Sequence, residues 1–271
     1  MTANPRLSSI EIVEDRTPNS RCDEGFLRVA RLRLRNHYDD DSCSRVYDCD
    51  VVTRPGSDAV VAVLFQIDET RRVRVLLRDG PRAPIYLRAH KRFVHPDPRS
   101  YTSVMELVAG IVEESDPPGD PGLQRRAATE TEEETGLSVA PQDFRVIGGE
   151  SFASPGMGDE KLYFCAAAAE LEQAGPGRGD GSVMEECART LTLELGEAIE
   201  ACRTGAIPDM KTELGLLRLA DHLGFIPQLG CFADELPPEL RSRYARLGVR
   251  AWQSEPASET GRPPRAPSRS G

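Results

Sequence analysis

The chain has 271 residues, of which 39% are hydrophobic and 29% are charged, and its net charge is −10. This length accommodates one sizeable domain with a smaller appendage. The acidic balance argues against a protein that coats duplex nucleic acid, because such proteins displace counterions with a basic surface. It leaves room for a small phosphate-bearing ligand, since a bound cation can reverse the local field.

The apolar segments and cysteines indicate where the protein resides. No run reaches the roughly 18 consecutive apolar residues that a transmembrane helix needs, and the opening MTANPRLSSIEIVEDR lacks the apolar stretch of a signal peptide. Seven cysteines are scattered without a CxxC pair, which favours reduced thiols over disulfides or a zinc site. We expect a cytoplasmic protein that binds neither membrane nor nucleic acid.

The first predicted elements are two strands, at 26–35 and 45–52. FLRVARLRLR alternates apolar and basic residues, as is typical of a half-buried strand, and RVYDCDVV indicates a returning strand. A hairpin of this size cannot hold a core alone, so it must pack on the main domain or on a second subunit. We assign residues 1–57 to an N-terminal β region that is a possible dimerisation element.

Residues 58–225 form the main predicted domain. We expect strands at 58–67, 73–78, 103–114, 144–153 and 161–171, and helices at 123–137, 195–204 and 209–224. The first strand, DAVVAVLFQI, is apolar almost throughout, which is typical of a buried central strand. Strands interleaved with helices predict an α/β domain with helix–sheet–helix layers.

Residues 226–271 are expected to form a C-terminal extension. It contains a short predicted helix, LRSRYARLGVRAW, which includes the chain's one tryptophan, Trp252. From about Ser254 the sequence is rich in Pro, Ser, Arg and Gly. That composition predicts disorder, because it offers too little apolar surface to fold.

Three carboxylates suggest the chemistry. Glu130, Glu133 and Glu134 lie in the predicted helix 123–137 at spacings that place them on one face. Their mutual repulsion is relieved by a hard divalent cation such as Mg²⁺, which prefers carboxylate and phosphate oxygens. Taken alone, the run ETEEET is better explained as a solvated charged face. Its surroundings favour a metal site.

Those surroundings resemble the Nudix box, in which a glycine, an upstream glutamate and an Arg-Glu-hydrophobic-x-Glu-Glu-x-Gly-hydrophobic helix follow in order. MELVAGIVEE and AATETEEETGL are similar to its opening and closing halves. ELVAG, the loop SPGMGDE (154–160) and the run GAIPDMKTELGLLRL (205–219) look like the ADP-ribose and nucleotide-sugar pyrophosphatase branch. The resemblance covers roughly residues 26–224. It implies a Nudix-type α/β/α sandwich with a mixed sheet, plus a small N-terminal antiparallel β hairpin domain.

The resemblance also implies an activity and a metal site. The expected reaction is hydrolysis of the diphosphate of ADP-ribose or a related nucleoside diphosphate sugar, giving a nucleoside monophosphate and a sugar phosphate. Glu130 and Glu134 would bind Mg²⁺ or Mn²⁺, with the carbonyl of Ala109 completing the site. Glu133 would be a further ligand or a catalytic residue that orients the ligands. The hairpin matches a β domain that swaps between subunits, which implies a homodimer.

Further residues would serve the substrate. In this branch the general base comes from a loop after the box, where Glu160 is one candidate and the pair Glu185 and Glu186 is the other. Four arginines, Arg82, Arg88, Arg92 and Arg99, are candidate phosphate or ribose contacts. Arg82 is favoured, because the family has an arginine after its second core strand. Gly156 would make room for backbone near the substrate, although a turn glycine is the simpler interpretation.

Two departures from the box matter. The loop SDPPGDPG lengthens the segment before the helix by about five residues. The upstream box glutamate therefore has four candidates: Glu113, Glu114, Asp116 and Asp120. Thr129 stands where the box has an arginine that orients a metal-binding glutamate, and Thr131 stands at a hydrophobic position. Arg126, four residues before Glu130, or Arg125 would have to replace that arginine.

The departures leave two other functions open. One is a ligand-binding or regulatory module that retains the Nudix fold but has little catalytic activity, which Thr129 and the longer loop favour. The other is a Nudix hydrolase that acts on a different diphosphate, such as a dinucleotide or coenzyme A. Turnover of a panel of nucleotide sugars with Mg²⁺ discriminates among the three.

Overall fold

The computed structural model describes residue 21 and residues 25–38, 42–179 and 187–246. The chain divides into two compact units, residues 1–219 and 220–271, and each is described by itself. The predicted disorder from about Ser254, and the end of the last predicted helix with Trp252, lie outside the described residues.

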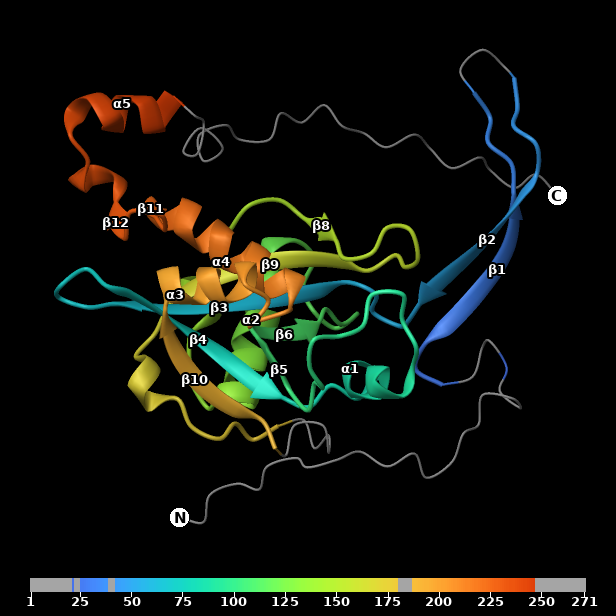
Figure 1. Cartoon of the computed structure of the whole chain (residues 1–271), viewed down its shortest axis with the longest axis horizontal. Coiled ribbons are helices and arrows are strands. Elements are labelled where there is room, and N and C mark those ends of the chain that lie inside the picture. The colour runs from blue at the N-terminus through green and yellow to red at the C-terminus, as the bar shows by residue number, and fades with distance from the viewer. Residues whose placement is uncertain (1–20, 22–24, 39–41, 180–186, 247–271) are drawn as a thin grey trace. The chain divides into compact units, whose positions relative to one another are not determined.

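A mixed sheet is the centre of the first unit (Figure 1). Its main order is β10-β4-β3-β9-β7, in which β3 and β9 are parallel and the other neighbours are antiparallel. Three short strands pair at the side of this path, β5 with β4, β6 with β3 and β8 with β9. The bounds are β3 (Ala59–Ile67), β4 (Val73–Gly80), β5 (Val104–Glu106), β6 (Val108–Ile111), β7 (Arg145–Val146), β8 (Ser151–Phe152), β9 (Lys161–Ala168) and β10 (Arg189–Glu194).

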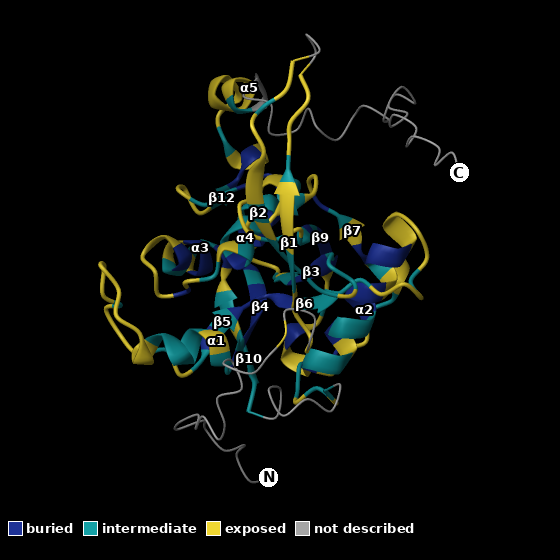
Figure 2. Ribbon diagram, turned by 90° about the vertical axis from the view of Figure 1, so that its right-hand side faces the viewer, coloured by how far each residue is buried: buried dark blue, intermediate teal, exposed yellow. Residues whose placement is uncertain are grey.

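Helices pack on both faces of this sheet. On one face, Val60 of β3 joins a buried cluster with Leu123 and Ala127 of α2 (Asp120–Thr135). On the other, Gly215 of α4 (Met210–Leu223) lies so close that a Cβ there would be 3.4 Å from Val63 of β3. Figure 2 shows α2 and α3 (Leu195–Arg203) on opposite sides of β3 and β4. The predicted mixed α/β architecture with a mixed sheet is confirmed.

Two predicted strands are wrong as continuous elements. The segment 103–114 forms β5 and β6, interrupted at Leu107, because β3 and β4 pair only next to their turn and then diverge. The segment fills the gap, pairing first with β4 and then with β3. Likewise 144–153 forms β7 and β8, separated by Gly148 with a positive φ of 73°. The edge strand β10 and the short helix α1 (Ala83–Tyr86) had not been predicted.

The N-terminal hairpin is a separate two-stranded antiparallel sheet, as predicted. It consists of β1 (Arg28–Leu34) and β2 (Tyr47–Thr53). Several of its apolar side chains are exposed, among them Phe26, Leu32 and Tyr47. The hairpin meets the loop SPGMGDE at the end of β2, where the Val52 N–H donates to the Met157 carbonyl at 2.9 Å.

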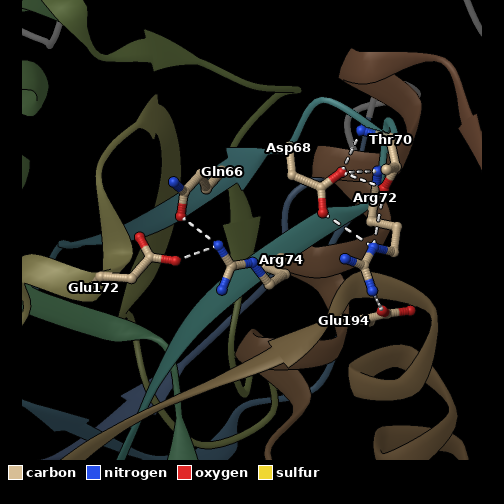
Figure 3. Close-up of polar contacts among 7 residues, drawn as sticks. All are labelled: Gln66, Asp68, Thr70, Arg72, Arg74, Glu172 and Glu194. Carbon is tan, nitrogen blue, oxygen red and sulfur yellow. Dashed lines mark hydrogen bonds and ion pairs between the residues drawn. The ribbon is translucent and has the colours of Figure 1, made fainter.

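A polar network fixes the turn between β3 and β4 (Figure 3). The Asp68 carboxylate accepts hydrogen bonds from the Thr70 hydroxyl at 2.6 Å and from the Arg72 backbone N–H at 3.0 Å. These bonds, the Thr70 hydroxyl first, lower the pKa of Asp68 to about 2. Arg74 of β4 extends the network to Gln66 at 2.9 Å and forms an ion pair with Glu172. Charged hydrogen bonds and an ion pair therefore stabilise the turn in addition to the backbone hydrogen bonds between β3 and β4.

The second unit begins within α4. Its described residues include the short antiparallel strands β11 (Phe225–Ile226) and β12 (Cys231–Phe232) and the helix α5 (Pro238–Arg246). Phe225 and Phe232 pack edge to face, with ring centroids 5.5 Å apart. In neither unit does any described helix have the length and apolar character needed to cross a bilayer.

Candidate functional site

Two parts of the expected metal site, Glu130 and the strand β6 that contains Ala109, meet where β6 faces α2. A Cβ on Gly110 would lie 1.8 Å from Cδ and Oε1 of Glu130, so the Glu130 carboxylate rests directly on the glycine backbone. Ala109 and Gly110 also line a cavity of about 710 Å³. A side chain at residue 110 would therefore displace the carboxylate, which explains the small residue at this point of the strand.

Arg126 lies next to the Glu130 carboxylate, where its charge can orient that side chain. Its Nη1 lies 3.6 Å from Oε1 of Glu130, and its Nε and Nη2 lie 3.0 and 3.3 Å from the two oxygens of Asp116. Nη2 also forms an ion pair of 2.9 Å with Glu113. Of the four candidate upstream acids, these two reach the arginine. Thr129 donates instead to the Arg125 carbonyl at 3.1 Å.

The environment of Arg126 favours its charged form. Burial alone would lower the pKa of the guanidinium, but hydrogen bonds to Asp116 and Glu113 outweigh it and raise the pKa. The Asp116 side chain is only 2% exposed, so it depends on this cation for compensation. Arg126 thus connects the lengthened loop to the helix that carries Glu130.

A buried threonine of the helix, Thr131, has a hydrogen-bond partner for its hydroxyl. Thr131 is fully buried, and its hydroxyl donates to the Ala127 carbonyl at 2.6 Å. One turn later, Thr135 donates to the Thr131 carbonyl in the same way. A threonine can replace a hydrophobic residue here because its hydroxyl finds a carbonyl on its own helix. The helix then ends at Gly136, which adopts a positive φ of 69°.

Glu134 faces the sheet and contacts an arginine of β4. The distance between Arg78 Nη1 and Glu134 Oε1 is 3.0 Å, and each side chain is 6% exposed. Glu133 uses its backbone carbonyl to accept the Gly179 N–H at 2.8 Å. Within the described part of the chain, no three His, Cys, Asp or Glu side chains are arranged as a group that could hold a metal ion.

The donor chemistry nevertheless fits a hard cation. Glu130 supplies a carboxylate beside the cavity wall formed by Ala109 and Gly110, and carboxylate and carbonyl oxygens are the ligands that Mg²⁺ prefers. Glu134 adds a second carboxylate, although a cation there must compete with the Arg78 guanidinium. Glu130 and the Ala109 carbonyl are therefore the stronger part of the expected ligand set.

The cavity is lined by a network of opposite charges. Glu106 of β5 is buried and forms ion pairs with Arg82 and Lys211. Burial alone would raise the pKa of Glu106, but Lys211 and Arg82 outweigh it and lower the pKa. Burial likewise opposes the charge of Arg82, and Glu106 more than compensates, so that the pKa of Arg82 is raised. Arg82, predicted as a substrate contact, thus lines the cavity as a cation.

The run GAIPDMKT joins this network from the start of α4. Asp209 accepts hydrogen bonds from the Thr212 N–H at 3.0 Å and its hydroxyl at 2.6 Å, and from Lys211 at 3.1 Å. The Thr212 hydroxyl in turn accepts the Leu107 N–H at 2.9 Å. The motifs ELVAG and GAIPDMKT therefore meet through two contacts, Glu106 with Lys211 and Leu107 with Thr212.

Glu160, one candidate base, also lines the cavity. Its Oε1 lies 2.8 Å from Nη2 of Arg54, which follows β2. The neighbouring Asp159 accepts from the Thr53 hydroxyl at 2.9 Å and from the Ser57 hydroxyl at 3.1 Å. The end of the hairpin thus fixes the loop that carries Glu160.

Glu185, Glu186 and Gly156 are the remaining predicted site residues. Glu185 and Glu186 lie outside the described residues. A Cβ at Gly156 would meet nothing within 4 Å, so the protein's own packing does not require glycine there. Sequence reasoning missed Arg54, Arg78 and Lys211, although Lys211 belongs to a quoted motif.

Buried cysteines add no nucleophile. Burial is the main cause that raises the pKa of both Cys165 and Cys202 to about 12. Both thiols remain protonated at neutral pH, and the thiol form is a poor nucleophile.

Comparison with models of known protein families finds no match to this chain, and comparison with curated proteins finds none either.

Proposed function

We propose that this chain is a Nudix-type hydrolase that uses Mg²⁺ or Mn²⁺ to cleave the diphosphate of ADP-ribose or a related nucleoside diphosphate sugar. One observation carries the proposal, namely that the Glu130 carboxylate rests on Gly110, a residue that lines the cavity together with Ala109. Arg126 supports it, because its contacts with Glu130, Asp116 and Glu113 provide the charged orientation that Thr129 cannot.

The residues around the cavity suit a dianionic diphosphate. A metal held by Glu130, Glu134 and the Ala109 carbonyl would neutralise phosphate charge and lower the pKa of the attacking water. Arg82 would bind a phosphate oxygen through its planar fork. Glu160, held by Arg54, would accept the proton of the water as a new P–O bond forms and the bridging P–O bond breaks.

The substrate preference and quaternary structure are part of the proposal. ADP-ribose leads because ELVAG, SPGMGDE and GAIPDMKT resemble that branch, and the structure brings parts of all three to one cavity. We further propose that the hairpin forms a homodimer, since its exposed Phe26, Leu32 and Tyr47 offer apolar surface for a second subunit.

One observation favours the alternative of a binding protein with little activity. Arg78 already compensates Glu134 in a buried ion pair, so the second carboxylate is less available to a metal. Turnover decides between the two. An active hydrolase releases a nucleoside monophosphate, whereas a binding module retains ADP-ribose intact.

The test is an assay of product release from a panel of nucleotide sugars with Mg²⁺, using wild type, Glu130→Gln and Glu132→Gln. Glu132 is an exposed residue of the same helix and serves as the matched control. We expect Glu130→Gln to reduce kcat/KM by at least about 100-fold, as loss of a metal ligand does, and Glu132→Gln to change it less than twofold. Equal activity in the two variants contradicts the metal site at Glu130, and no turnover by wild type contradicts the hydrolase.

A further inference from the structure

A basic segment contributes Arg88, Asp97 and Tyr101 to the lining of the cavity. We name residues 88–101, RAHKRFVHPDPRSY, the lip. Four cationic side chains, Arg88, Lys91, Arg92 and Arg99, stand in it against one carboxylate, Asp97. In a chain with a net charge of −10, such a local excess of positive charge requires an explanation beyond solubility.

The lip has a defined structure. Arg88 makes two hydrogen bonds to Asp97, at 2.9 and 2.8 Å, and its guanidinium lies 4.1 Å from the centroid of the Phe93 ring. Arg99 donates to the carbonyls of Gly205 and Ala206, at 2.7 and 2.9 Å. These contacts close the lip on itself and attach it to the loop before α4. A preorganised cationic surface loses less entropy when it binds an anion.

The lip encloses a cavity of its own, which adjoins the one at the expected active site. The lip cavity measures about 580 Å³ and includes the four cationic residues in its lining. It shares Ile85, Arg88, Asp97 and Tyr101 with the site cavity. A ligand with its diphosphate at Arg82 can therefore extend past Tyr101 into the lip.

Lys91 and Arg92 are the lip residues best placed to bind an anion. Arg88 is neutralised by Asp97, and Arg99 is engaged by two carbonyls. Lys91 and Arg92 are exposed and line the same cavity. Phe93 and Tyr101 add aromatic walls. The lining thus combines cations for an anionic substituent with aromatic side chains.

We propose that the lip cavity is a subsite for an anionic substituent, a carboxylate or an additional phosphate, carried by the substrate away from its diphosphate. The proposal rests on the proposed function and refines its substrate class. Preferred substrates are then nucleoside diphosphate derivatives with a further negative charge, rather than those with neutral sugars.

Two ligand pairs test the proposal. UDP-glucuronate against UDP-glucose isolates a carboxylate, and ADP-ribose 2′-phosphate against ADP-ribose isolates a phosphate. Binding is measured by calorimetry without metal, and kcat/KM is measured with Mg²⁺. The lip variant is Lys91→Gln with Arg92→Gln. The control is Arg145→Gln with Arg203→Gln, which removes two exposed charges outside both cavities.

We expect wild type and the control to prefer the charged member of at least one pair by about fivefold or more, an advantage that weakens with salt. The lip variant should reduce that preference to below about twofold. The ligand pair that shows the preference tells whether the subsite binds a carboxylate or a phosphate. A wild-type preference below twofold in both pairs, or one that the lip variant retains, overturns the subsite. Preferential binding without any turnover supports the subsite and instead contradicts the proposed hydrolase.

Discussion

Arg78 of β4 and Glu134 of α2 form an ion pair of 3.0 Å in which each side chain is 6% exposed. The same strand carries a second arginine pair, Arg74 with Glu172, whose side chains are 32% and 56% exposed. The two pairs differ in what surrounds them rather than in their chemistry. Breaking the first leaves a carboxylate in a poorly solvated place, whereas breaking the second exposes charges that water already reaches.

We expect Arg78→Met to destabilise the protein by about 3 kcal/mol, which is typical when one partner of a buried ion pair is removed. Arg74→Met should destabilise the protein much less, because water already reaches the charges of an exposed pair. Urea unfolding monitored by circular dichroism measures both. Mg²⁺ should stabilise Arg78→Met more than wild type, because a cation at Glu134 would replace the missing guanidinium. Equal losses in the two variants, with no additional effect of Mg²⁺, would refute this account of Glu134.

Arg126 gives a second prediction, about the orientation of Glu130. Arg126→Ala should weaken Mg²⁺ affinity by about tenfold, the lower range for residues that orient metal ligands. The exposed neighbour Arg125 provides the control, and Arg125→Ala should leave the affinity within twofold. The measurement is the Mg²⁺ concentration for half-maximal activity. Adding Thr129→Arg to Arg126→Ala should restore part of the affinity, which a purely structural role for Arg126 would not produce.

The central part of the fold could be predicted because its signal is local. β3 and β9 are long apolar runs and α2 is a run of helix formers ended by Gly136, so composition and periodicity place them. The interruption at Leu107 could not be predicted, because it depends on the divergence of β3 and β4. The edge strand β10 alternates in RTLTLE but follows a long glycine-rich stretch that obscured it.

For the candidate site too, only contacts between residues close in the sequence could be predicted. The spacing of four residues suggested Arg126 for Glu130, and the structure places the two in contact. The contact of Lys211 with Glu106 joins residues 105 positions apart, which one sequence cannot reveal. Arg78 ends a mainly apolar predicted strand, and no sequence pattern relates it to Glu134 on the helix. Ion pairs between residues far apart in the sequence are therefore the part of the site that only the three-dimensional structure reveals.

Glu106 leads to a pH prediction. Its pKa in the folded protein lies below the ordinary value of 4.5 because Lys211 and Arg82 outweigh the effect of burial. The ionised carboxylate therefore stabilises the protein above that value, and the contribution is lost as the pH falls through the folded pKa. Glu106→Gln should cost about 2 kcal/mol near neutral pH, less than a fully buried pair because Arg82 and Lys211 are partly exposed. The deficit should shrink at acid pH.

Urea titrations of wild type and Glu106→Gln across the acid range measure that deficit. The exposed Glu114 is the control, and Glu114→Gln should change the free energy of unfolding by less than about 0.5 kcal/mol. A deficit that stays constant with pH would mean that packing rather than charge explains the loss.

The pKa of Asp68 is lowered as well, here by hydrogen bonds within a turn. Its pKa of about 2 means that its contribution is complete above the ordinary value of 3.8 and is lost only as the pH falls toward 2. Asp68→Asn should therefore lower the melting temperature at neutral pH but not below pH 2, where Asp68 becomes protonated in the folded as well as the unfolded protein. Glu69→Gln in the same turn is the control and should leave the melting temperature unchanged in both pH ranges. Calorimetry at several pH values checks this, and NMR titration of Asp68 reports its pKa directly.

Gly110 provides the sharpest test of where Glu130 lies. In Gly110→Ala the new Cβ would occupy the place of the Glu130 carboxylate, since the two would be 1.8 Å apart. The side chain is flexible, so we expect it to swing away at a stability cost of about 1–2 kcal/mol, with a loss of Mg²⁺ affinity of at least about tenfold. Gly156→Ala meets nothing within 4 Å and should change neither quantity. If Gly110→Ala binds Mg²⁺ like wild type, the carboxylate on this glycine is not a metal ligand, and the site must be sought elsewhere along α2.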